Sequence, residues 1–197
     1  MNPNEPIDRK RTALLLMDFQ SGIVAGVGGG DQAGLLQRAR AVLAAARAAG
    51  VQVIYVAIGF REGHPEVSPR NAAFSGLKTS GFFAAGDPKA EIHPELAPQK
   101  GDITVTKRRV SAFSGSDLEV VLRSKGIETV VLAGIATSGV VLSTVRHAAD
   151  ADYGIVVLSD CCADRDPEVH RCLIEKVFPR QAKVTTAEEF RLALKGP

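Results

Sequence analysis

The chain has 197 residues, which is enough for one domain with a sizeable hydrophobic core. Hydrophobic residues make up 45% of it and charged residues 23%, which is the composition of an ordinary soluble globular protein. The formal net charge of +2 is too small to indicate a nucleic acid or an anionic membrane as a partner.

The cysteines indicate a reducing compartment. Cys161, Cys162 and Cys172 are odd in number and two are adjacent, so a disulfide framework is not expected, and their spacing matches no zinc site. We therefore expect the cytoplasm. The apolar run at 13–17 is too short for the core of a signal peptide, and no stretch approaches the length of a membrane span.

The first half of the chain predicts three strands and one long helix. Apolar runs predict strands over 12–17, 51–57 and 103–106. Residues 33–49 are rich in Ala, Leu and Arg and stop at Gly50, which predicts a helix. Residues 59–100 hold most of the Pro and Gly and no long periodic segment, so we expect loops that cover an active site.

Strands and helices continue to alternate in the second half. Strands are predicted over 129–133, 155–159 and 182–184, and helices over about 140–152 and from Pro167 to about Phe178. Two capping boxes, Ser116-Asp-Leu-Glu119 and Thr186-Ala-Glu-Glu189, predict the starts of a helix that runs to about Lys125 and of a terminal helix.

This alternation predicts a Rossmann-like, three-layer α/β/α fold with a mostly parallel sheet of about six strands. Neither an internal repeat nor a low-complexity linker interrupts it. We therefore expect a single domain over 1–197, with 1–11 as a tail. In such sheets, ligands bind beyond the carboxyl ends of the strands, where the strand order reverses.

Three strand ends carry residues that could share one site. Asp18 ends the first strand, Lys107 follows the third, and the turn from Gly134 to Val140 follows the fourth. Taken singly, Asp18 also fits a helix cap or turn, and Lys107 an exposed charge. Together, a carboxylate and an amine facing converging backbone N–H groups would make an acid–base site.

Five motifs resemble the isochorismatase-like hydrolase superfamily, also called the cysteine hydrolases, over nearly the whole chain. These motifs are Leu14-Leu-Leu-Met-Asp-Phe-Gln20, Val105-Thr-Lys107, Ser111-Ala-Phe113 with Asp117-Leu118, Gly134-Ile-Ala-Thr137 and Leu158-Ser-Asp160-Cys-Cys162. The first and the Gly134 motif together are fairly specific for that family. The resemblance implies a hydrolase with a small-molecule substrate and a homo-oligomeric assembly.

Carried over by position, the resemblance makes Asp18 the acidic catalytic residue and Lys107 its partner. It implies a cis peptide bond between Ile135 and Ala136, with the backbone N–H groups of Ala136 and Val140 as donors to an oxyanion. The substrate-binding residues that we predict are Phe19, Gln20, Phe113 and Thr137.

The departure from the family lies at Val140, where most amidases of the family carry the nucleophilic cysteine. Valine has no lone pair with which to attack a carbonyl, so a thiol step at this position is excluded. Cys161 and Cys162 are alternative nucleophiles, but no nearby His or helix N-terminus clearly activates them. Buried, inert thiols are the favoured interpretation.

The resemblance to the isochorismatase branch of the family implies a mechanism that needs no thiol. Members of this branch lack the cysteine and hydrolyse a vinyl ether without a covalent intermediate. We therefore predict a hydrolase that uses acid–base chemistry by Asp18 and Lys107. A catalytically silent relative, kept as a binding or oligomeric scaffold, is the alternative.

No cofactor and no metal are predicted. The glycine-rich run 26–30 follows no strand directly and lacks the Lys-Ser/Thr of a phosphate loop. The nicotinamidase relatives bind a metal through an Asp-x-His element after the second strand, and 57–61 has no such element.

Overall fold

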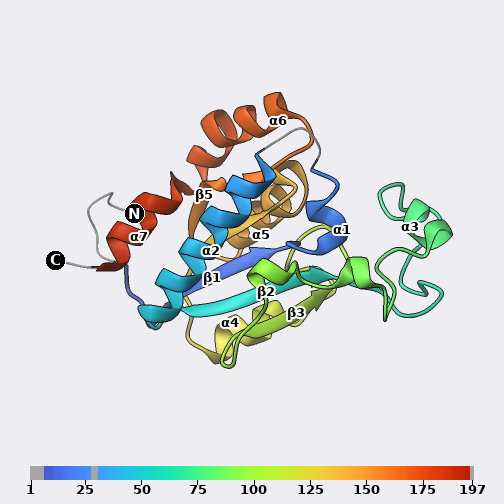
Figure 1. The fold of residues 1–197 in the computed structure, drawn as a ribbon, viewed down its shortest axis with the longest axis horizontal. Coiled ribbons are helices and arrows are strands. Elements are labelled where there is room, and N and C mark those ends of the chain that lie inside the picture. The colour runs from blue at the N-terminus through green and yellow to red at the C-terminus, as the bar shows by residue number, and fades with distance from the viewer. Residues whose placement is uncertain (1–6, 28–30, 196–197) are drawn as a thin grey trace.

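The structure is a computed structural model that describes residues 7–27 and 31–195. Its centre is a six-stranded, fully parallel sheet with the order β3-β2-β1-β4-β5-β6 (Figure 1). The strands are β1 (Thr12–Met17), β2 (Gln52–Ile58), β3 (Ile103–Lys107), β4 (Thr129–Ile135), β5 (Gly154–Ala163) and β6 (Lys183–Thr185). The predicted α/β fold is confirmed.

Helices cover both faces of the sheet and complete three layers (Figure 1). The helix α2 (Gln32–Ala48) packs on one face with α7 (Ala187–Lys195), and α4 (Leu118–Ser124) packs on the other face with α5 (Leu142–Asp150). The remaining helices are α1 (Ser21–Val24), α3 (Ser75–Ser80) and α6 (Pro167–Cys172). None of the helices in the described ranges is both long and apolar enough to cross a membrane.

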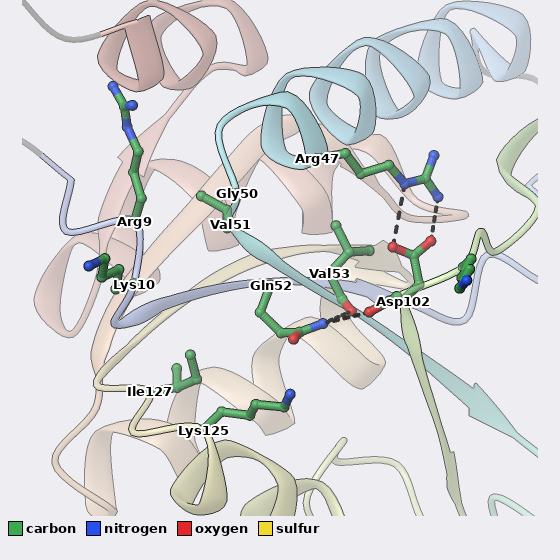
Figure 2. A pocket seen from close by; sticks show the side chains of 12 residues that line it. Arg9, Lys10, Arg47, Gly50, Val51, Gln52, Val53, Asp102, Lys125 and Ile127 are labelled. Carbon is green, nitrogen blue, oxygen red and sulfur yellow. Dashed lines mark hydrogen bonds and ion pairs between the residues drawn. The ribbon is translucent and has the colours of Figure 1, made fainter.

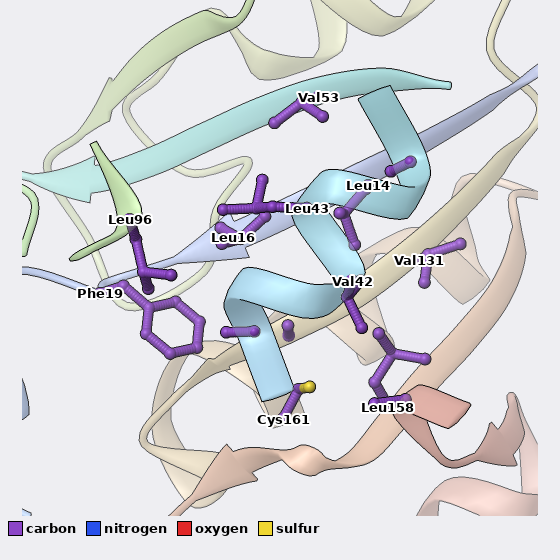
Figure 3. Packing of buried hydrophobic residues seen from close by; sticks show 14 of the residues in the cluster. Leu14, Leu16, Phe19, Val42, Leu43, Val53, Leu96, Val131, Leu158 and Cys161 are labelled. Atoms are coloured by element: carbon purple, nitrogen blue, oxygen red, sulfur yellow. The ribbon is translucent and has the colours of Figure 1, made fainter. Parts of the chain in front are cut away.

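The core follows from the alternation of side chains along each strand. Every residue of β1 is buried, with Leu14 and Leu16 on the α2 face and Leu15 and Met17 on the opposite face. Figure 3 shows the α2 face, where Val42 and Leu43 of the helix meet strand residues such as Leu14, Val53 and Val131. Each fully buried leucine contributes about 2 kcal/mol of hydrophobic stabilisation.

Three elements differ from the prediction, because their local hydrogen bonds or their strand pairing differ. The predicted helix 140–152 begins with a π-helical turn, Thr137–Val141, before α5, and the helix predicted to end near Phe178 stops at Cys172 and continues as π and 3₁₀ turns. The strand β5 is longer than predicted, because its register against β4 shifts between Leu132 and Gly134.

The two predicted capping boxes have opposite outcomes. At Thr186 the box is confirmed, because Glu189 N donates to Thr186 Oγ1 at 3.2 Å and Thr186 N donates to a Glu189 carboxylate oxygen at 2.8 Å. At Ser116 it is wrong: Asp117 is the N-cap of α4, and Ser116 Oγ donates to Ala112 O at 2.6 Å.

The region 59–100 contains α3, two 3₁₀ turns (Pro88–Ala90 and Pro94–Leu96) and long loops, as its composition predicts. Its own apolar cluster consists of Ile58, Phe60, Val67 and Phe74. Figure 1 shows α3 standing apart from the three layers, beyond the carboxyl ends of β2 and β3. The single domain over 1–197 stays a prediction; part of its tail, 1–6, and part of the glycine-rich run, 28–30, lie outside the described residues.

Candidate active site

The strand order brings the predicted strand ends together. Met17, the last residue of β1, pairs with Val56 of β2 on one side and with Gly134 of β4 on the other. The chain passes from β1 through β2 to β3 and then crosses back to β4, so the strand order reverses beside β1. Asp18 therefore lies at the switch point, next to the turn that follows β4.

Asp18 and Lys107 are in direct contact at this point. Lys107 Nζ lies 3.0 Å from Asp18 Oδ2, and the side chains are only 2% and 8% exposed. Lys107 Nζ also donates to Arg109 O at 3.0 Å. Asp18 Oδ1 is buried, and no atom of the described residues hydrogen-bonds to it. An unpaired buried carboxylate oxygen is costly, so it is a ready acceptor or proton carrier for a bound molecule.

The environment of Asp18 changes its protonation equilibrium. Burial raises the pKa of Asp18 above its ordinary value, whereas the nearby Lys107 ammonium and the Ile58 amide oppose that rise. A carboxyl whose pKa is raised holds its proton at higher pH, which suits exchange of a proton with a substrate.

The turn after β4 begins next to the end of β1, because Gly134 pairs with Met17. The Ile135–Ala136 peptide bond is cis in the structure. The N–H groups of Gly139 and Val141 donate to Ala136 O at 3.1 and 3.3 Å. A side chain at Gly134 would place its Cβ 3.0 Å from Met17 O, so glycine permits the close approach of the two strand ends.

Val140 is buried in the apolar cluster on the α5 side of the sheet. It is 2% exposed and shares this cluster with Met17, Val141 and Cys162. Its position in the turn is the predicted one.

A second segment supports the same turn, and its residues were not predicted. Asp164 Oδ2 accepts a hydrogen bond from Ser138 N at 2.7 Å, and His170 Nδ1 lies 2.8 Å from Thr137 Oγ1. Burial lowers the pKa of His170. The only sequence signal was Pro167, which places the start of α6 near the end of β5.

The predicted substrate contacts have structural tasks. The Gln20 amide donates to Ile58 O and Ala90 O and accepts from Ile58 N, at 2.7–2.9 Å, so its hydrogen bonds tie the end of β2 to the loop region. Thr137 is fully buried against His170. Contact of either side chain with a substrate stays a prediction.

The two predicted aromatic contacts belong to the core. Phe19 is fully buried on the α2 face, near Leu16 and Leu96 (Figure 3). Phe113 is 7% exposed and stacks on His147 of α5 with ring centroids 4.4 Å apart. Both rings thus pack in the core, and contact of either ring with a substrate stays a prediction.

The cysteines are poor nucleophiles in this structure. Cys161 and Cys162 are buried on opposite faces of the sheet. Burial raises the pKa of the Cys161 thiol strongly and that of Cys162 to about 12. Cys172 is exposed, on α6.

No three His, Cys, Asp or Glu side chains within the described ranges lie close enough together to hold a metal ion. His64 Nε2 lies 2.7 Å from Phe82 O, and Glu66 pairs with Arg61 and Arg108. Both residues are thus engaged within the loop region. The absence of a metal and a cofactor stays a prediction.

A separate cavity of about 440 Å³ opens at the amino ends of the strands (Figure 2). It is lined by several cations, and its carboxylate, Asp102, is paired with Arg47, whose Nη2 lies 2.6 Å from Asp102 Oδ2. The residues that line it lie at the end of α2, at the start of β2 and in the segments before β1, β2, β3 and β4, whereas Asp18 and Lys107 lie at the carboxyl ends of the strands. This cavity is therefore not the candidate active site.

Comparison with known proteins agrees with this geometry. The isochorismatase domain family matches residues 12–189. The uncharacterized isochorismatase family protein YwoC of Bacillus subtilis (strain 168) is 37% identical, over 93% of this chain and 94% of its own length. The ureidoacrylate amidohydrolase RutB of Stutzerimonas stutzeri (strain A1501) is 35% identical, over 94% of this chain and 80% of its own.

A similar solved structure is a cysteine hydrolase from Pseudomonas syringae pv. phaseolicola 1448A. It superimposes with a TM-score of 0.87 at 27% identity, and the match covers 98% of this chain and 96% of the other. Sequence and fold thus agree over almost the full length, and the chain belongs to the isochorismatase family of hydrolases.

Proposed function

We propose that this chain hydrolyses a small molecule by acid–base chemistry at Asp18 and Lys107, without a covalent cysteine step. Asp18 is the general acid or base, Lys107 is its electrostatic partner, and the N–H groups of Ala136 and Val140 stabilise developing negative charge. The observation that carries the proposal is the buried Asp18–Lys107 contact at the switch point, with Asp18 Oδ1 left without a partner.

The absence of a covalent step rests on the side chains near the turn. Val140 cannot donate an electron pair. Cys161 and Cys162 are buried, and their raised pKa values keep both as neutral thiols near pH 7. Water is therefore the nucleophile in this proposal, and the chain is a family member without the catalytic cysteine.

Asp18 has two ways to assist water. With a vinyl ether, protonated Asp18 gives its proton to the enol-ether carbon, and water then captures the oxocarbenium ion. With an amide or ureide, ionised Asp18 takes a proton from the attacking water while the carbonyl oxygen receives hydrogen bonds from the turn. The raised pKa of Asp18 favours the first, acid role.

The wider setting of the enzyme is also a proposal. We infer a single domain, a cytoplasmic location and a homo-oligomeric assembly. The similarity to a protein named ureidoacrylate amidohydrolase supports a small substrate. A silent binding or scaffold protein is the second candidate, and the burial of Val140 in an apolar cluster favours it, because the nucleophile position has become part of the core.

Asp18→Asn tests the proposal. Purified wild-type protein is assayed against small amides, ureides and enol ethers, and we expect Asp18→Asn to lower turnover by about 10²–10⁴-fold. Asp152→Asn is a matched control, because both aspartates adopt positive φ, at 60° and 61°. Turnover that Asp18→Asn leaves intact contradicts the proposal, and ligand binding without turnover in the wild type favours the silent relative.

A further inference from the structure

Arg109 lies directly beside the Asp18–Lys107 pair through its main chain. Its carbonyl oxygen accepts from Lys107 Nζ at 3.0 Å, and Lys107 in turn contacts Asp18. The next residue, Val110, lies close to Gly139, because a Cβ added there would be 4.0 Å from Val110 Cγ1. The segment 107–110 therefore runs from the ion pair to the turn that follows β4.

The guanidinium of Arg109 has no carboxylate partner among the described residues. Its Nη1 donates to Arg108 O at 2.6 Å and its Nη2 donates to Glu66 O at 3.0 Å, and both acceptors are neutral carbonyls. The residue is partly buried, so solvent compensates its charge only in part. A partly desolvated cation without an anionic partner favours the binding of an anion.

The charged groups around Arg109 carry an excess of positive charge. Glu66 pairs with Arg108 and with the exposed Arg61, and Asp18 pairs with Lys107. Among the buried and partly buried groups, the cations Lys107, Arg108 and Arg109 thus face two carboxylates. The unmatched positive charge is that of Arg109.

We propose that Arg109 binds a carboxylate of the substrate, so that the substrate class is a small carboxylic acid whose scissile group lies at Asp18. This inference rests on the proposed function of the Asp18–Lys107 site. A guanidinium presents a planar fork that matches a carboxylate with two parallel hydrogen bonds. Because Nη1 and Nη2 each carry a second hydrogen, and Nε carries one, Arg109 retains donors for such a ligand.

Binding of charged and neutral probes tests the assignment without turnover. The probes are malonamate, succinamate and glutaramate, each compared with its neutral diamide by isothermal titration calorimetry. At least one half-amide should bind wild-type protein 10-fold or more tightly than its diamide. Arg109→Gln should remove this preference and leave diamide binding unchanged, whereas Arg109→Lys, which keeps the charge without the fork, should retain part of it.

Arg9→Gln is the control for location, because Arg9 lines the basic cavity at the opposite edge of the sheet (Figure 2). Its preference for the half-amide should equal that of the wild type. Loss of the preference in Arg9→Gln, or equal weakening of both probes in Arg109→Gln, would overturn the assignment; the second result would identify Arg109 as a purely structural tie between Glu66 and β3. If Arg109→Gln does not fold, Arg109→Lys takes its place, and an unchanged preference in that variant contradicts recognition by the guanidinium fork.

The wild type itself can also refute the inference, if none of the three half-amides binds more tightly than its diamide. Asp18→Asn separates the two proposals. A preference for carboxylates in both the wild type and Asp18→Asn, together with no turnover by the wild type, supports Arg109 and contradicts the acid–base proposal. Turnover that depends on Asp18, in a protein that shows no preference for the half-amides, supports the acid–base proposal and contradicts the assignment of Arg109.

Discussion

Cys161 and Cys162, near the end of β5, are the alternative nucleophiles, and burial makes both unreactive. With a pKa of about 12, Cys162 is a thiolate in about one molecule in 10⁴ at pH 8. Burial acts on Cys161 in the same direction. Both thiols are thus unreactive, although their side chains point to opposite faces of the sheet.

We predict that only Cys172 reacts with a thiol reagent in native protein at pH 8. Cys172 is exposed, whereas Cys161 and Cys162 are buried, so labelling should yield one fast thiol in native protein and three in urea. Mass spectrometry of the labelled peptides is the measurement. Cys172→Ser should show no fast labelling at all, and fast labelling of that variant would make Cys161 or Cys162 a candidate nucleophile again.

Asp18 should give the protein a characteristic dependence of stability on pH. Because burial raises its pKa above the ordinary 3.8, the native protein keeps the Asp18 proton at pH values where the unfolded chain loses it. The contribution of Asp18 is therefore most favourable below pH 3.8 and declines as pH rises from there to the folded pKa.

The measurement is the free energy of unfolding in urea from pH 3 to 7, for wild type and Asp18→Asn. The difference in favour of the wild type should shrink as pH rises, and Asp152→Asn should not reproduce this trend. A difference that grows with pH would mean that attraction by Lys107 outweighs burial.

The sequence predicts the position of a residue that ends a strand. It does not predict the face to which a side chain points when that face depends on one backbone dihedral angle. Asp18 and Lys107 follow buried runs, so their place at one edge of the sheet was predictable. Asp18 adopts φ of 60°, which interrupts the alternation of the strand, and Phe19 then enters the core on the α2 face. No pattern in the sequence indicates such a left-handed residue.

At the scale of elements, the turn after β4 depends on the segment between β5 and α6. Asp164 holds the Ser138 amide, and His170 contacts Thr137. We predict that Asp164→Ala lowers the free energy of unfolding by about 1 kcal/mol and accelerates hydrogen exchange of the Ser138 amide.

Asp166→Ala is the matched control for this turn. Asp166 caps α6 by accepting from Glu168 N and Val169 N, so its loss should cost about 1 kcal/mol as well. It should not change exchange at Ser138. Equal exchange in the two variants would show that the Asp164 contact does not hold the turn.

The existence and order of the elements were predictable, because apolar runs and Gly and Pro punctuation recur along the chain. The extension of β5 was not, since the shift in register between Leu132 and Gly134 depends on pairing with β4. The same limit applies at Ser116, whose hydroxyl donates to Ala112 O and accepts from Leu118 N at 3.3 Å, whereas Asp117 occupies the N-cap position of α4. Such tertiary and loop contacts compete with local signals.

At the scale of the whole molecule, stability is unevenly distributed. The sheet lies between two large apolar clusters, whereas the segment around α3 relies on the small cluster of Ile58, Phe60, Val67 and Phe74. The helix α3 has no buried residue. Local opening should therefore be easiest in this segment.

We predict that trypsin first cleaves native protein in this segment, after Arg70 or Lys78, both of which are exposed. Mass spectrometry of early fragments identifies the sites. Arg123 and Lys125 are equally exposed but lie at the end of α4, which Leu118 and Leu122 anchor in the core. First cleavage after either of those residues would contradict the expected ranking.

The reversal of strand order beside β1 divides the chemistry along the chain. The proposed acid–base pair, Asp18 and Lys107, comes with Arg109 from the half of the chain before α4, and the turn with Val140 and its supports comes from the half after it. A mutation that erases a nucleophile in the later half leaves the proton-handling half intact. During evolution, substitutions in the later half can thus change the reaction while the residues of the earlier half stay the same.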